Sequence, residues 1–212
     1  MKPFTTLEGV AASLLQDNID TDVIVRIERI SRLVRGQFAP WAFEVLRYRS
    51  DGSDGNDGSE NPDFVLNRAP FRQAQILLAG ANFGCGSSRE MAVWSLEEFG
   101  IRCIIAPSFG DIFFGNCLQN GVLPITLARP QIEALSAATA GGALLKVDLQ
   151  ARTVSTDATG TIAFSLADTQ REALLSGLDE VDQTLIHAAL IAEFQQQDRQ
   201  RRPWVYVSRP IV

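Results

Sequence analysis

The chain has 212 residues, of which 46% are hydrophobic, so it is long enough for one domain of moderate size with a real core. Its formal net charge of −6 argues against a nucleic-acid partner. No apolar run approaches membrane-spanning length and the first residues lack the apolar core of a signal peptide, so we expect a cytoplasmic protein without a membrane anchor.

The first part of the chain is irregular and polar-rich, and its clearest feature is a carboxylate cluster. The segment Asp17-Asn18-Ile19-Asp20-Thr21-Asp22 places three carboxylates in six residues, ahead of the apolar run Val23-Ile24-Val25. This pattern is typical of a turn that leads into a strand. Because clustered carboxylates repel one another unless something compensates them, a polar loop at a binding site is the functional alternative. A calcium loop is not favoured, since its glycine and distal glutamate are missing.

Arginines then recur at every third position: Arg26, Arg29, Arg32 and Arg35. On a helix they would drift slowly around one side. Such a run is usually a solvated face, although it can also bind carboxylates or form a docking surface. Residues 50–62 follow as an acidic, low-complexity segment with little to bury, so we expect a mobile insertion loop there.

Residues 76–127 have the pattern of an ordered α/β core. We expect strands at 76–80, 101–106 and 122–127, with helices from about 88 to 99 and from 111 to 119. Gly100 is a natural stop for the first helix, and Pro124 favours an edge or strand-end position for the third strand. The resulting βαβ unit implies parallel strands.

The most informative segment is Asn82-Phe83-Gly84-Cys85-Gly86-Ser87-Ser88-Arg89-Glu90, between the first of these strands and its helix. Gly84 and Gly86 permit positive φ and a close approach of a ligand to the backbone. Two hydroxyls and a guanidinium follow where a helix N-terminus offers free N–H groups, which suits a carboxylate. The structural alternative is a helix capped by Ser87 or Ser88, with Glu90 as the capping partner.

Two nucleotide motifs are excluded at this turn. The dinucleotide fingerprint needs a third glycine where Arg89 stands, and the phosphate loop needs Lys-Ser/Thr after its second glycine. The cysteines, Cys85, Cys103 and Cys117, are odd in number and lack paired spacing. We therefore expect neither a disulfide framework nor a metal site in this chain.

The last third continues with alternating elements. Helices are expected at 130–140, 168–177 and from 181 to about 199, with strands at 144–149, 153–156 and 161–166. The only histidine, His187, lies in the last helix, and we expect it to be structural. Its isolation also excludes a self-contained Ser-His or Cys-His hydrolase. We predict a single domain over residues 1–212, with residues 200–212 as a tail.

Three blocks together resemble one family: residues 18–24, 82–90 and 104–116, with Asn61-Pro62-Asp63-Phe64-Val65-Leu66 between the first two. In order and spacing they are similar to the small subunit of 3-isopropylmalate dehydratase, which is equivalent to the swivelling C-terminal domain of aconitase. The resemblance covers nearly the whole chain, from about Gly9 to the last helix. It implies an α/β fold, the swivelling β/β/α domain, with a mostly parallel sheet and flanking helices.

The resemblance also implies a function, which is hydro-lyase activity in leucine biosynthesis in complex with a large subunit. That partner would carry a [4Fe-4S] cluster, whereas this chain would bind no metal or cofactor. The substrate would be a small diacid, and the complex a heterodimer or heterotetramer. By similarity Ser87 is the base, Ser88 and Arg89 bind substrate, and Arg26 and Arg32 are candidates in a specificity-setting loop. The remaining site-supporting residues would be Asp20, Asp22, Gly84, Cys85 and Gly86.

Two departures from the family pattern leave alternatives open. Met91 stands where the family usually has histidine, and Val25 lies near a usual proline. Neither change removes a proposed catalytic group, but both lie beside the site. A related diacid is therefore an alternative substrate: 2-methylmalate, whose dehydration gives citraconate, or dimethylmalate. A non-catalytic anion-binding module is a further alternative.

Overall fold

We describe the molecule from a computed structural model, which covers residues 1–50 and 56–206. The chain divides into two compact units, residues 1–177 and the residues from 178 onward. Part of the predicted acidic loop (51–55) and of the predicted tail (207–212) lies outside the described residues. The single domain over the whole chain stays a prediction. No described helix is both long and apolar enough to cross a membrane.

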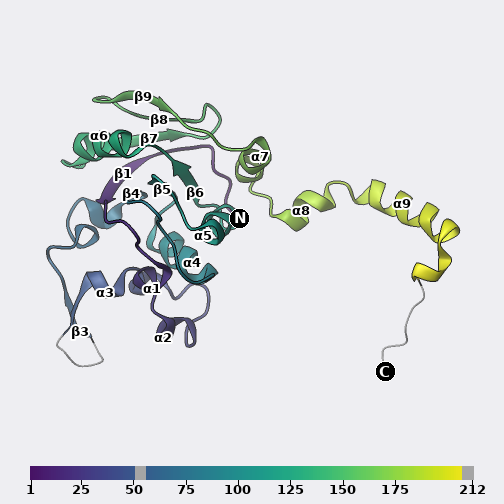
Figure 1. The fold of residues 1–212 in the computed structure, drawn as a ribbon, viewed down its shortest axis with the longest axis horizontal. Coiled ribbons are helices and arrows are strands. Elements are labelled where there is room, and N and C mark those ends of the chain that lie inside the picture. The colour runs from purple at the N-terminus through teal and green to yellow at the C-terminus, as the bar shows by residue number, and fades with distance from the viewer. Residues whose placement is uncertain (51–55, 207–212) are drawn as a thin grey trace. The chain divides into compact units, whose positions relative to one another are not determined.

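One seven-stranded sheet organises the first unit, in the order β6-β5-β4-β1-β7-β8-β9 (Figure 1). Strands β6, β5, β4 and β1 run parallel, and β7, β8 and β9 continue the sheet antiparallel. The α/β class with parallel strands and flanking helices is thus confirmed. The strands are β1 (Thr6–Leu14), β4 (Ile76–Ala79), β5 (Cys103–Ala106), β6 (Leu123–Thr126), β7 (Leu144–Asp148), β8 (Thr153–Thr156) and β9 (Gly160–Ala163).

The parallel strands read as continuous apolar runs because both of their faces are covered. In β4, Leu77 and Ala79 belong to one core, whereas Ile76 and Leu78 belong to the core on the opposite face. This alternation follows from the two-residue period of a strand. Pro124 lies in β6, which is at the edge of the sheet as expected.

Helices cover both faces of the sheet (Figure 1). Helices α1 (Thr21–Ile24), α3 (Glu44–Arg47) and α4 (Glu90–Phe99) contribute to the first core. Helices α6 (Arg129–Thr139) and α7 (Asp168–Ser176) contribute to the second. Helix α5 (Asp111–Gln119) serves both, since Phe113 packs into the first core and Phe114 against the second.

The N-terminal part of the chain departs most from expectation. It contains β1, the central strand that joins the parallel and antiparallel halves, where an irregular segment was expected. The predicted strand at Val23-Ile24-Val25 is wrong, because residues 21–24 form the helical turn α1. The arginine run does not lie on one long helix, since α2 spans only Ile27–Ile30.

The acidic insertion is partly ordered. Strand β3 (Asn56–Glu60) pairs antiparallel with β2 (Tyr48–Ser50), and Arg72 forms an ion pair with Glu60 at 2.6 Å. The loop prediction is therefore wrong for residues 56–60. Three 3₁₀ helices complete the first unit: η1 (Ala39–Trp41), η2 (Val65–Asn67) and η3 (Phe71–Gln73).

The second unit contains α8 (Glu180–Leu185), α9 (Ala188–Arg201) and the 3₁₀ helix η4 (Pro203–Tyr206). The single helix expected from 181 to about 199 is wrong, since it is broken at residues 186–187. Within this unit Asp198 accepts hydrogen bonds from Arg202 and from Tyr206. His187 is exposed at the start of α9.

Candidate active site

The predicted site lies at the carboxyl ends of the parallel strands, where loops after β1, β4 and β5 meet. The amide of Gly84 donates to the carbonyl of Ile19 at 2.7 Å, and the amide of Gly110 donates to the carbonyl of Phe83 at 2.9 Å. In open α/β sheets ligands bind at this edge. Sequence blocks that are about 20 to 65 residues apart in the chain thus form one surface.

Glycines allow the turn after β4 to pack this closely. Gly84 has φ of +71°, and a Cβ there would lie 2.2 Å from Cγ of Phe113. Gly86 has φ of +91°, and a Cβ at Gly110 would lie 2.7 Å from the carbonyl oxygen of Gly84. The predicted positive φ at Gly84 and Gly86 is therefore confirmed.

The carboxylate-rich segment is joined directly to this turn. Asp20 and Cys85 form a parallel bridge, in which the amide of Thr21 donates to the carbonyl of Cys85 at 3.0 Å. The Thr21 hydroxyl donates to the Ser87 carbonyl at 3.2 Å. The Asp20 carboxylate caps α1 by accepting from the amide of Val23 at 2.8 Å. Asp20 thus orders the backbone beside the serines.

Ser87 and Ser88 are exposed and do not cap the helix. The N-cap residue of α4 is Arg89, and its side chain makes no capping hydrogen bond. The capping interpretation is therefore wrong. Within the described part of the chain, neither serine hydroxyl has a hydrogen-bond partner, although the Ser87 carbonyl accepts from Thr21 and from the Arg89 amide. Both hydroxyls remain free beside an uncapped helix N-terminus, which carries partial positive charge.

Arg89 is held in place by Asp22. Its Nη1 forms an ion pair with the Asp22 carboxylate, and the Arg89 side chain is only 16% exposed, against 53% for Asp22. Arg89 thus compensates the negative charge of one of the three clustered carboxylates. The Asp22 carboxylate contacts Nη1 of the planar guanidinium. The remaining N–H groups can therefore donate to a second carboxylate.

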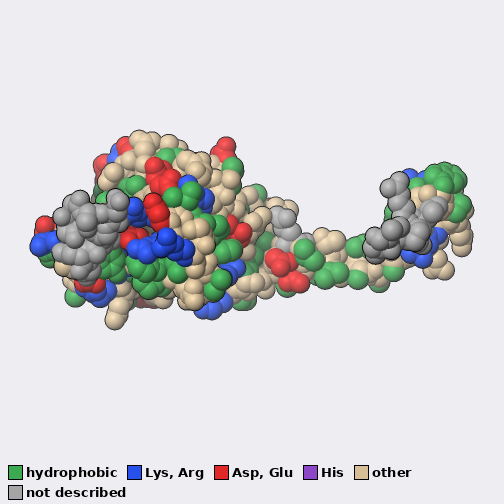
Figure 2. All heavy atoms as spheres, turned by 90° about the horizontal axis from the view of Figure 1, so that it is seen from below, with side chains coloured by type: hydrophobic (Ala, Val, Ile, Leu, Met, Phe, Trp, Pro, Cys, Tyr) green, Lys and Arg blue, Asp and Glu red, His purple; other side chains and the backbone are tan. Residues whose placement is uncertain are grey.

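The two arginines of the predicted specificity loop lie outside this cluster. Arg26 pairs with Glu28 at 3.3 Å, and Arg32 is exposed. No hydrogen bond or ion pair in the described residues links either one to Ser87 or Arg89. Figure 2 views the side on which α2 lies in Figure 1, and basic and acidic side chains lie beside one another there.

The other two arginines of that run have structural contacts. Arg29 pairs with the buried Glu44 at 2.6 Å and lies 3.4 Å from the ring centre of Trp41. Arg35 pairs with Glu97 of α4 at 3.7 Å. Arg29 therefore anchors the segment, whereas Arg32 and Arg35 are exposed and the Arg26 side chain is 36% exposed.

The cysteines offer no metal centre here. Cys103 and Cys117 are buried, and desolvation raises the pKa of both thiols. Among residues 1–50 and 56–206, no group of three His, Cys, Asp or Glu side chains could hold a metal ion. Cys85 is half-buried within the glycine turn.

Two contacts beside the site had no signal in the sequence. The Asp17 carboxylate accepts from the amide of Ala81 at 2.7 Å and pairs with Arg129, at the start of α6. Asn120 donates to the Glu90 carboxylate at 2.9 Å. Both join positions far apart in the chain, and neither pattern stands out in a single sequence.

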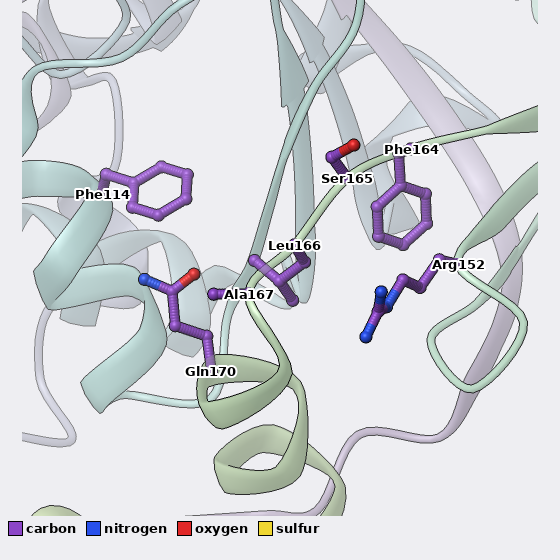
Figure 3. A pocket seen from close by; sticks show the side chains of 7 residues that line it. All are labelled: Phe114, Arg152, Phe164, Ser165, Leu166, Ala167 and Gln170. Carbon is purple, nitrogen blue, oxygen red and sulfur yellow. The ribbon is translucent and has the colours of Figure 1, made fainter.

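A separate hollow of about 410 Å³ lies between α5, α7 and the segment after β9 (Figure 3). Its single charged side chain, Arg152, is paired with Asp168. None of the predicted site residues lines it, so it is not the predicted site. The lining residues are Phe114, Arg152, Phe164, Ser165, Leu166, Ala167 and Gln170.

Comparison with known proteins gives a consistent result. A family model described as the aconitase C-terminal domain matches residues 1–130. A 3-isopropylmalate dehydratase small subunit from Mesorhizobium japonicum is 45% identical over 206 residues, which is 96% of this chain and 100% of that protein. Proteins of the same name from Teredinibacter turnerae and Neisseria meningitidis serogroup C are 44% and 43% identical over 97% of this chain, and 98% and 99% of theirs.

A solved structure shows the same fold. A crystal structure of 3-isopropylmalate dehydratase from Methanocaldococcus jannaschii aligns with a TM-score of 0.64 at 24% identity. The alignment covers 90% of this chain and 99% of that chain.

Proposed function

The chain belongs to the aconitase C-terminal domain family and, within it, to the 3-isopropylmalate dehydratase small subunits; from this premise we propose that it is the small subunit of a hydro-lyase of leucine biosynthesis. The reaction interconverts 2-isopropylmalate and 3-isopropylmalate by dehydration and rehydration. The observation that carries the proposal is the free Ser87 hydroxyl beside Arg89 at the uncapped start of α4.

Ser87 is the proposed base, which removes a proton from the substrate carbon. A serine hydroxyl is a weak acid, so its alkoxide needs nearby positive charge. The N-terminus of α4 and the Arg89 guanidinium supply that charge within a few residues. Ser87 is also free of any capping bond that would hold its hydroxyl away from a ligand.

Ser88 and Arg89 are the proposed carboxylate-binding residues. The Arg89 fork can bind a carboxylate with the N–H groups that Asp22 leaves unoccupied. Asp22 limits the rotamers of this side chain before the substrate arrives, so less side-chain entropy is lost on binding. Arg26, which pairs with Glu28, and Arg32, which is exposed, are proposed to contact substrate only in the assembled enzyme.

The proposed partner is the large subunit, in a heterodimer or heterotetramer. A [4Fe-4S] cluster on that subunit supplies, when bound, a Lewis acid for the leaving hydroxyl. The described residues of this chain do not fit such a cluster, since no three His, Cys, Asp or Glu side chains among them are placed to hold a metal ion. The cytoplasmic location expected from the sequence stays a prediction.

The departures at Val25 and Met91 bear on the substrate only indirectly. Val25 is fully buried, and Met91 packs against the same core. Val25 therefore offers no direct substrate contact, whereas Met91 is only partly buried. The relatives, which are named 3-isopropylmalate dehydratase small subunits, are what favours 3-isopropylmalate over the smaller 2-methylmalate or dimethylmalate.

The test is a reconstituted assay. The chain is co-expressed with the large subunit of its own organism, the cluster is rebuilt anaerobically, and absorbance of the unsaturated diacid is followed from 3-isopropylmalate and from 2-methylmalate. Turnover of 3-isopropylmalate that falls at least about 10³-fold in Ser87→Ala supports the proposal. Normal turnover in Ser87→Ala overturns the base assignment. Turnover of neither diacid by a complex with an intact cluster overturns the function in favour of an anion-binding module.

A further inference from the structure

The side-chain amide of Asn120, at the end of α5, makes hydrogen bonds to both α4 and α5. Asn120 is buried, and its Nδ2 donates to the Glu90 carboxylate and to the carbonyl of Asn116, both at 2.9 Å. Its Oδ1 accepts from Nε1 of Trp94 at 3.0 Å. These bonds fix the orientation of the amide, because only its N–H groups can donate to a carboxylate.

Glu90 is the residue after Arg89 in the chain, so a second carboxylate belongs to the same turn as this guanidinium. Asp22 forms an ion pair with Arg89, whereas the described structure contains no ion pair between Arg89 and Glu90. The Glu90 carboxylate instead turns toward α5, where Asn120 binds it. A neutral amide thus holds the carboxylate of the residue next to Arg89.

We propose that Asn120 is a positioning residue, which keeps the Glu90 carboxylate away from Arg89 so that this side chain stays available to the substrate. The proposal rests on the proposed function, because it assigns Arg89 to substrate binding. It adds a role for Asn120 and Glu90 that sequence reasoning did not reach.

The physical reason is competition between anions. A released Glu90 carboxylate is tethered to the same turn, so its effective concentration near Arg89 and the α4 N-terminus is high. It would bind the same N–H groups as a substrate carboxylate. Because such competition weakens ground-state and transition-state binding alike, KM should rise while kcat changes little.

The test uses three variants of the chain in the reconstituted complex. Asn120→Ala releases the carboxylate and should raise KM for 3-isopropylmalate on the order of tenfold, comparable to one charge-assisted hydrogen bond. Glu90→Gln is the matched control, since its amide oxygen can still accept from Asn120, and KM should stay within about twofold of wild type. The double variant Glu90→Gln/Asn120→Ala should return KM close to the wild-type value, because a neutral side chain cannot compete.

The double variant separates this role from a purely structural one. It lacks the same contacts to Trp94 and Asn116 as Asn120→Ala, so damage to packing would leave KM high in both. Recovery of KM in the double variant therefore supports the proposal. An unchanged KM in Asn120→Ala, or an equally raised KM in both variants, overturns it.

A crystal structure of the Asn120→Ala chain alone provides a readout that needs no partner. The Glu90 carboxylate is expected within ion-pair distance of Arg89, and finding it still turned toward α5 overturns the proposal. If the wild-type complex turns over no diacid, the proposed function fails, while this structure still decides where the carboxylate lies.

Discussion

At the scale of single residues, the site depends on positions where a side chain has no room. Gly84 combines a positive φ with contact to the Phe113 ring, and Gly110 lies against the carbonyl of Gly84. Sequence reasoning identified the glycines of the turn from their spacing alone. It missed Gly110, whose role appears only when the loop after β5 packs on the turn.

The first prediction concerns Gly84. Gly84→Ala should lower the free energy of unfolding by about 2–5 kcal/mol, because its Cβ would overlap Phe113 at a φ that alanine adopts poorly. The matched control is Gly115→Ala in α5, where nothing lies within 4 Å of the added Cβ. That change should stabilise the chain by about 0.5–1 kcal/mol, since alanine favours helix. Urea unfolding of both variants measures the difference, and equal stabilities would contradict the assigned close contact.

Asp17 is a single residue whose charge contributes to the stability of the fold. Its pKa is lowered by the hydrogen bond from the Ala81 amide and by the Arg129 guanidinium. A carboxyl whose folded pKa is lowered stabilises the fold above its unfolded pKa, about 3.9, and loses that effect as the pH falls through the folded pKa. This one carboxylate joins the loops after β1 and β4 to the start of α6.

The second prediction follows from the direction of this pKa shift. Asp17→Asn should have a lower Tm than wild type at pH 7, and the difference should shrink once the pH falls below about 4. Asp157→Asn, in the exposed turn between β8 and β9, is the control and should show no such trend. Thermal unfolding followed by circular dichroism from pH 7 to pH 3 provides the comparison. A difference that grows toward low pH would show that the ion pair is not what Asp17 contributes.

At the scale of elements, α4 connects the predicted catalytic turn with the arginine-containing segment. Its first turn follows Ser87, Ser88 and Arg89, while Glu98 near its end accepts hydrogen bonds from three backbone amides. These are Gly36 at 2.6 Å, Phe38 at 2.5 Å and Ala39 at 3.2 Å. A carboxylate that accepts several amide hydrogen bonds is a strong anchor for a loop.

The third prediction tests this anchor. Glu98→Ala should speed hydrogen exchange at Gly36, Phe38 and Ala39 by roughly 10- to 100-fold, equivalent to losing about 1.5–3 kcal/mol of charge-assisted hydrogen bonding. Glu97→Ala is the control on the same helix. Among the described residues the Glu97 carboxylate pairs only with the exposed Arg35, at 3.7 Å, and such a surface pair contributes little. Equal exchange rates in the two variants would show that Glu98 does not hold the segment.

Some helices and strands could be predicted from the sequence and others could not. The bounds of α5 and β8 agree with expectation, and Gly100 ends α4 as expected, where it adopts the left-handed conformation. These elements carry local signals, namely apolar periodicity and a glycine stop. Local signals failed at Val23-Ile24-Val25, where the β-branched run predicted a strand. The Asp20 cap and the bridge to Cys85 instead fix a helical turn, and the bridge is a contact far along the chain.

At the scale of the whole molecule, the central strand β1 was the largest omission. Its small residues Gly9, Ala11 and Ala12 give weak strand propensity, yet it pairs with both β4 and β7. Ser87, Ser88 and Arg89 of the predicted site follow one another in the chain, so their proximity needed no knowledge of the fold, and their roles stay a prediction. Their partner Asp22 and the neighbour Asn120 depend on tertiary contacts, which a single sequence shows only through resemblance to a family.

The fourth prediction concerns the two units. All residues of both hydrophobic cores lie within residues 1–177, and the amino group of Met1 donates to the carbonyl of Gly177 at 2.9 Å. A chain ending after Gly177 should therefore fold by itself, with a Tm within about 3 °C of the full chain, equivalent to roughly 1 kcal/mol or less. Ending the chain after Ser165 is the control, because it removes α7 with the buried Leu174 and should lower Tm far more. If the chain ending at Gly177 instead loses its cooperative unfolding transition, the second unit contributes to the fold of the first. If the shortened chain keeps its cooperative unfolding transition, the residues after 177 contribute little to the stability of the sheet and have another role.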